Sequence, residues 1–132
     1  MGVVVSHRYT GIYAGMIGVS VVTGTIGTAA TSGSVVLPAP NLNLSMFNLA
    51  LSDNATLGTA GITTITFRLN GVTFFTEGIY LPSAPGSQVG SGYIRVLGGN
   101  NIAVPTGNAP MTWTLSTALT AGSFTFNAYF TP

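Results

Sequence analysis

Residues 64–76 read TITFRLNGVTFFT, and this stretch decides how we interpret the rest of the sequence. Apolar and polar side chains alternate on both sides of Asn70-Gly71, a dipeptide typical of two-residue hairpin turns because both of its positions need positive φ. One face of the hairpin would then be mainly apolar, as a half-buried sheet requires. The cross-strand pairs predicted for this turn are Leu69 with Val72, Phe67 with Phe74, and Ile65 with Thr76.

The same alternation recurs in short segments on either side of this hairpin. It is visible at 41–51, 93–97, 112–116 and 124–131. Short strands separated by turn signals about every ten residues indicate a β-sandwich. We expect the single tryptophan, Trp113, in its core, and we expect Met46 on the same face as Leu44. The last strand should place one apolar set on its inner face: Phe124, Phe126, Ala128 and Phe130.

The first part of the chain has a different composition. Residues 12–37 are apolar and rich in Gly, Ala, Ser and Thr, and they end at Pro38-Ala39-Pro40. Two prolines in three residues mark a break in structure. We therefore divide the chain into an N-terminal assembly segment at 1–37, a proline hinge at 38–40 and an Ig-like sandwich at 41–132.

The N-terminal segment fits two conformations. As a helix, it would carry small residues at spacing i, i+4, i+7 on two faces, which lets helix backbones approach closely. Its glycines and β-branched residues disfavour an isolated helix, so this helix would need packing among copies. The alternative is extended, because Val3, Val5, His7 and Tyr9 alternate as in a strand. We adopt the helix, which makes the expected fold class α+β. The residues expected at the interface between copies are Gly11, Gly15, Gly18, Val22, Gly24 and Gly27.

Charge is scarce along the whole chain. There are three arginines, one aspartate and one glutamate, and there is no lysine. A soluble domain normally carries charge on about a quarter of its residues, so a lone copy would be poorly protected against association. Three arginines cannot neutralise a row of phosphates, which argues against nucleic acid as a partner. We expect the surface to be covered by identical copies or by glycans. The two candidate glycosylation sites are Asn43, in Asn43-Leu44-Ser45, and Asn54, in Asn54-Ala55-Thr56.

The residues needed for catalysis are too few. A catalytic or metal site needs several converging titratable groups, and this chain has one His, one Asp, one Glu and no Cys. We therefore expect no enzyme activity, no cofactor and no metal. Asp53 stands beside Asn54, and we expect it to form a turn.

Three segments share a pattern with a known family: residues 48–71 (NLALSDNATLGTAGITTITFRLNG), 81–88 (LPSAPGSQ) and 112–131 (TWTLSTALTAGSFTFNAYFT). They resemble the C-terminal domains of archaeal type IV-like pilins and archaellins. The resemblance implies a secreted subunit whose N-terminal helices bundle inside an extracellular adhesion filament at the cell surface. The sandwiches, often glycosylated, would form the sheath of this homopolymer, and the subunit would contact the membrane only before assembly.

Other functions fit the same residues. An extended N-terminus would favour assembly by donated strands, or a virion coat or decoration protein. A carbohydrate-binding module would use exposed tyrosines, for which the candidates are Tyr13, Tyr80, Tyr93 and Tyr129. A filament, a closed particle and a soluble monomer can be told apart by negative-stain imaging.

The scarcity of titratable groups predicts resistance to acid. Stability depends on pH only through groups whose proton binding differs between the folded and unfolded chain, and this chain offers few of them. We expect it to stay folded from pH 7 down to about pH 3. Thermal melts followed by circular dichroism across this range check the expectation, and a fall in Tm of more than about 10 °C would contradict it.

Overall fold

The computed structural model describes residues 2–5, 20–37, 42–84, 93–103 and 110–131, with only the backbone described for 2–5 and 93–103. These residues form strands, and none of them is in a helix. The strands are β1 (Gly2–Val5), β2 (Ser20–Ile26), β3 (Ser32–Val35), β4 (Asn43–Leu51), β5 (Gly61–Leu69), β6 (Val72–Leu81), β7 (Tyr93–Ala103), β8 (Met111–Leu115) and β9 (Phe124–Thr131).

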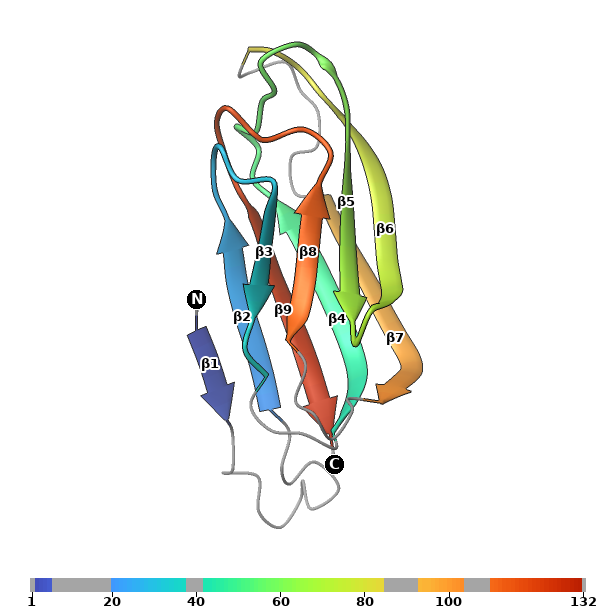
Figure 1. Ribbon diagram of the computed structural model, residues 1–132. Coiled ribbons are helices and arrows are strands. Elements are labelled where there is room, and N and C mark those ends of the chain that lie inside the picture. Colours follow the sequence, from blue (N-terminus) through green and yellow to red (C-terminus); the bar gives the residue numbers. More distant parts are fainter. Residues whose placement is uncertain (1, 6–19, 38–41, 85–92, 104–109, 132) are drawn as a thin grey trace.

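The strands form two antiparallel sheets that pack face to face (Figure 1). One sheet has the order β1-β2-β9-β4-β7, and the other has the order β3-β8-β5-β6. Strands β2 to β9 thus divide equally between the sheets, and β9 returns to lie between β2 and β4. Two four-stranded sheets with these long-range pairings form a jelly roll, to which β1 adds a fifth strand at one edge.

The expected α+β fold with a long N-terminal helix is wrong. Residues 20–26 form β2, which pairs with β9, and residues 32–35 form β3, which pairs with β8. The segment before the prolines therefore contributes strands to both sheets. The described part of residues 1–37 belongs to the same sandwich as the residues after 41, while the hinge at 38–40 lies outside the described residues.

Two glycines explain why the segment resembled a helix-packing stretch. Gly24 lies opposite Phe126, and a Cβ built on Gly24 would be 2.4 Å from Phe126 Cζ. Gly33 lies opposite Trp113, and a Cβ there would be 2.6 Å from Trp113 Cζ2. Each glycine leaves room for an aromatic ring of the neighbouring strand. These two glycines accommodate rings within one subunit rather than the backbone of a neighbouring helix.

The Asn70-Gly71 turn forms as predicted. Its φ angles are 55° and 75°, and Leu69 pairs with Val72. The other predicted pairs are wrong, because the register shifts between Phe67 and Arg68. The shift pairs Phe67 with Phe75 rather than Phe74, and Ile65 with Glu77 rather than Thr76.

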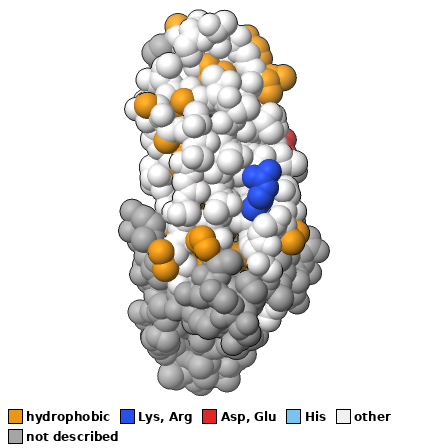
Figure 2. Space-filling view, viewed as in Figure 1, with side chains coloured by type: hydrophobic (Ala, Val, Ile, Leu, Met, Phe, Trp, Pro, Cys, Tyr) orange, Lys and Arg blue, Asp and Glu red, His pale blue; other side chains and the backbone are white. Residues whose placement is uncertain are grey.

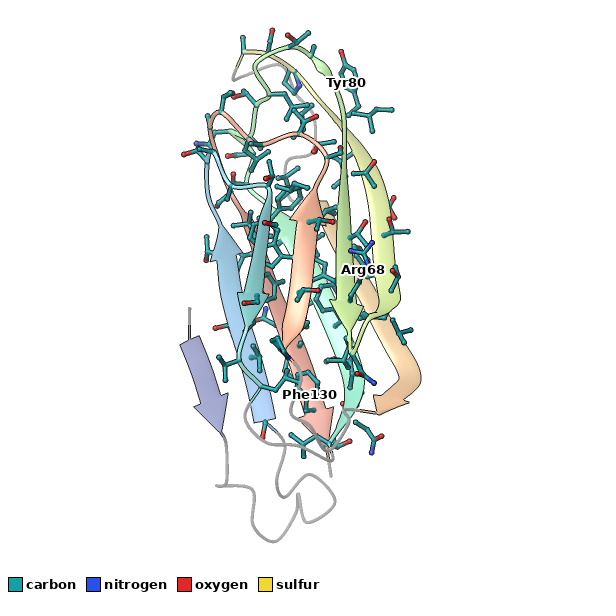
Figure 3. All side chains as sticks on the ribbon, viewed as in Figure 1. Arg68, Tyr80 and Phe130 are labelled. Carbon is teal, nitrogen blue, oxygen red and sulfur yellow. The ribbon has the colours of Figure 1, made fainter. Side chains whose placement is uncertain are left out.

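The core lies between the sheets and is rich in aromatic rings. The predicted inner set of β9, from Phe124 to Phe130, is buried, and so is Trp113. Phe130 lies at the opposite end of the sandwich from Tyr80 (Figure 3). Met46 is exposed rather than on the face of Leu44, because a register shift between these two residues reverses the alternation and buries Phe47 instead.

A pair of loops closes one end of the sandwich. The backbone of Ser52 donates to Ser123 O at 3.0 Å, and Ser123 N donates to Ser52 Oγ at 3.0 Å. Between them, Gly122 has a φ of 82°, and a Cβ built on it would lie 2.5 Å from Ala55 Cα. Asp53 and Asn54 occupy the turn of this loop, as predicted for Asp53.

Gly122→Ala should destabilise the fold strongly. The left-handed backbone alone costs an L-residue about 1–2 kcal/mol, and the overlap with the backbone of Ala55 adds to it. We expect a loss of about 2–4 kcal/mol in the free energy of unfolding, measured by urea denaturation. Gly27→Ala is the control, because no heavy atom lies within 4 Å of a Cβ at Gly27. Equal stability of the two variants would refute this account of the loop.

Candidate assembly surface

The outer face of the β3-β8-β5-β6 sheet is a layer of hydroxyl side chains. Buried residues alternate along each strand with residues that face outward, and most of the outward residues are Thr or Ser. β-branched threonine fits the pleated surface of a strand well. The hydroxyl residues of this face are Ser32, Ser34, Thr64, Thr66, Thr73, Thr76, Thr112, Thr114 and Ser116.

Hydrogen bonds link these side chains across the strands. Thr66 Oγ1 and Thr76 Oγ1 lie 3.1 Å apart and share a hydrogen bond between β5 and β6. Thr64 N donates to Ser116 Oγ at 2.8 Å. A hydroxyl group both donates and accepts, so such a face can pair with another polar surface, including a copy of itself.

One arginine interrupts this layer. Arg68 lies opposite Thr73 on β6 and opposite Thr112 on β8. Figure 2 shows it as a blue group midway along a mostly white face, and Figure 3 labels it at the same place. The single charge of Arg68 leaves most of this face uncharged, so it protects the rest of the face little against association with other molecules.

Two exposed apolar side chains lie at the upper end of this face, as oriented in Figure 1. Ile62 and Tyr80 lie directly opposite each other on β5 and β6, and 64% and 55% of their surfaces are exposed. Between them and the hydroxyl layer stands Gly78, and a Cβ built on it would lie 3.3 Å from Ile62 Cγ2. Orange side chains gather at this end in Figure 2. Adjacent exposed apolar side chains are candidates for contact with a partner.

The outer face of the other sheet carries amides and an aromatic side chain. Asn127 Nδ2 donates to Asn48 Oδ1 at 2.9 Å, which links β9 to β4. Ser45 Oγ donates to the backbone oxygen of Tyr129 at 3.0 Å. The side chains of both asparagines and Tyr129 are half-buried.

Three of the residues predicted at a helical interface lie in or just after β2. Val22 and Gly24 both face inward within the sandwich. Val22 is fully buried in the core, Gly24 lies under the Phe126 ring, and Gly27 follows β2 in an open turn. The helical spacing that grouped these three residues does not apply to a strand. The other predicted members, Gly11, Gly15 and Gly18, lie outside the described residues.

The two candidate glycosylation sites differ in setting. Asn43 is the first residue of β4 and is half-buried, whereas Asn54 is exposed in a turn. Ser52 Oγ donates to Asn54 Oδ1 at 2.7 Å. Glycosylation stays a prediction at both. Of the tyrosines considered for carbohydrate binding, Tyr80 is exposed and Tyr129 is half-buried; Tyr13 and the side chain of Tyr93 lie outside the described residues.

The described residues hold no concave or metal-binding feature. They contain no pocket, and nowhere among them do three His, Asp or Glu side chains gather. In the same residues, no helix has the length and apolar character needed to cross a membrane.

Sequence reasoning did not find the Ile62–Tyr80 pair, although a signal for it exists. Within β5, the alternation places Ile62 in phase with outward Thr64 and Thr66, not with buried Ile65. Thr63 takes the inward position, where its hydroxyl donates to Thr117 O at 2.7 Å. An isoleucine in phase with the outward threonines of a strand is the sequence signal for an exposed apolar side chain at this position.

Comparison with known proteins finds a similar fold among solved structures. No protein-family model matches the sequence, and no curated protein matches it. Among solved structures, a chain of the "Cyanophage Pam1 capsid asymmetric unit" has a similar fold, with a TM-score of 0.54 and 20% sequence identity. The match covers 86% of this chain and 85% of that chain, so the two are of similar length. At this identity the likeness shows the fold alone.

Replacing Ile62 and Tyr80 together by serine should reduce association without unfolding the protein. Both side chains are exposed, so we expect the free energy of unfolding to change by less than about 1 kcal/mol. Sedimentation velocity over a concentration series should show weaker association than in the wild-type chain. Val72→Ser is the control, because Val72 is also exposed but lies at the other end of β6. Equal effects of the two changes would exclude a specific role for the pair.

Proposed function

We propose that this chain is a structural subunit of a virus particle, either a coat protein or a small decoration protein, used in many identical copies. The observation that carries the proposal is the strand order β2-β9-β4-β7 packed against β3-β8-β5-β6. Jelly rolls of this kind are found in viral capsids, lectins and cupins. The solved chain with a similar fold comes from a cyanophage capsid.

Fold alone does not select among these uses, so the surface must decide. The outer faces carry hydroxyl and amide groups where most soluble domains carry Lys and Glu, and the whole chain has five charged residues. Such a surface suits a protein that is covered by neighbours. The chain has one His, one Asp and one Glu, so a metal centre with three protein ligands would need all of them to converge. The described residues show no such group. Assembly therefore fits the residues better than metal-dependent catalysis does.

The filament hypothesis has less support than the virion hypothesis. It depended on N-terminal helices that bundle at the centre of a pilus, and residues 20–26 and 32–35 of that segment are strands inside the sandwich. A virion subunit needs only lateral contact between folded sandwiches. The exposed Ile62–Tyr80 pair and the hydroxyl face are available for such contact.

The experiment uses an antiserum raised against the recombinant full chain. Material from the source culture is separated on a density gradient into closed particles, filaments and soluble protein, and each fraction is gold-labelled and imaged by negative-stain electron microscopy. We expect the label on closed particles and the chain in that fraction by mass spectrometry. Antiserum pre-adsorbed with the chain is the control.

Other outcomes would replace the proposal. Label along filaments would restore the pilus or donated-strand hypothesis. A chain found only as a soluble monomer that is retained on a glycan column would favour a carbohydrate-binding module, with Tyr80 as the first residue to substitute.

A further inference from the structure

The two edges of the β3-β8-β5-β6 sheet are built differently. β6 forms one edge, and its ladder with β5 is broken by the register shift beside Phe67. Glu77 of β6 lies opposite fully buried Ile65, which places this charged residue on the inward face of an edge strand. Bulges and inward-pointing charges at an edge oppose pairing with a further strand. The β6 edge is thus protected against association.

β3 forms the other edge, and it has neither a bulge nor an inward-pointing charged residue. Its ladder with β8 runs without a shift from Ser32–Thr114 to Val35–Met111. Leu115 N donates to Thr31 O at 2.7 Å. Because alternate residues of an antiparallel strand direct both backbone polar groups to the same neighbour, residues 31, 33 and 35 face β8. The backbone groups of Ser32 and Ser34 then face the open edge, where no described strand lies.

The side chains of this edge suit a second copy. Ser32 and Ser34 are exposed and uncharged, and 63% of Val36, just beyond the strand, is exposed. Across the sheet, Ser34 of β3 lies opposite Thr112 of β8, and Thr112 lies opposite Arg68 of β5. Arg68 is the nearest described positive charge along this line of paired residues. If two copies met at Ser34, five strand spacings, about 24 Å, would separate their Arg68 residues. This exceeds the Debye length of about 8 Å, so the two charges would scarcely repel.

We propose that β3 pairs antiparallel with β3 of a second copy about a twofold axis at Ser34. The pairing places Ser34 opposite Ser34 of the partner copy and Ser32 opposite Val36, so both exposed valines are covered. The two four-stranded sheets become one continuous sheet across the dimer, and the interface is the same surface patch on each copy. The pairing specifies one contact between subunits of the proposed assembly. Its biological role rests on the proposed function, but the pairing itself can be tested separately.

The first test is a cross-link. The chain has no cysteine, so in Ser34→Cys any disulfide must join two copies. Opposed residues in a hydrogen-bonded pair lie about 5.5 Å apart at Cα, within the range that a disulfide spans. We expect mild oxidation to give a covalent dimer on non-reducing gels. Thr76→Cys is the matched control on the protected β6 edge, and we expect it to stay monomeric. Equal dimer yields from the two variants, or no dimer from Ser34→Cys, would overturn the pairing.

The second test is a charge placed at the edge. Ser34→Lys puts two like charges at the twofold axis, and we expect the dimer dissociation constant, measured by sedimentation equilibrium, to rise about tenfold or more. Thr125→Lys adds the same charge on the exposed outer face of β9 and should leave the constant unchanged. If neither variant weakens the dimer, the interface lies elsewhere. If both tests fail but gold label is found on closed particles, the β3 pairing is wrong and the proposed function stands. If both tests succeed but closed particles carry no label, the β3 pairing stands and the proposed function is wrong.

Discussion

The contact between Phe47 and Phe67 joins the two sheets at the centre of the sandwich, with 4.7 Å between the ring centroids. Phe126 lies 5.0 Å from Phe67, and Phe75 lies 5.2 Å from Phe47. These rings come from β4, β5, β9 and β6, so both sheets meet in one aromatic cluster. Removing a buried ring of this kind costs about 3–5 kcal/mol. Two irregularities bring rings to this cluster: the register shift in β6 and the bulge in β4. Gly24 leaves room for the ring of Phe126.

Sequence patterns correctly predicted the elements that are determined by residues close together in the sequence. The Asn70-Gly71 turn needs only two residues with positive φ, and the last strand needs only its alternation, so both were predicted correctly. The N-terminal segment was predicted incorrectly because its glycines are explained by rings far away in the sequence: Gly24 by Phe126 and Gly33 by Trp113. Without those partners, glycines in an apolar stretch fit a helix-packing surface equally well. The bulges were missed for a similar reason, since only the cluster around Phe47 shows why the register must shift.

Sequence reasoning predicted the composition of the outer face but did not locate the exposed Ile62–Tyr80 pair. The shortage of charge indicated that the surface should be covered, and the outward threonines of β5 and β8 are where the alternation put them. Of the residues expected at a helical interface, Val22 is fully buried in the sandwich core and so faces no neighbouring copy. Threonine links the two properties of this surface. It favours strands where Lys and Glu do not, so the choice of strand-forming residues for the outer faces also leaves those faces without charge.

The position of β9 has a consequence for the order of events in the cell. This strand fills the middle of its sheet between β2 and β4, and it pairs Ser20 with Phe130. β8 holds the corresponding place between β3 and β5. Neither sheet can be completed during synthesis until its late strand has left the ribosome, and folding that depends on such distant pairing is slow. Until then the early strands expose apolar faces and unpaired edges, so the chain depends on avoiding premature contact with its neighbours during that interval.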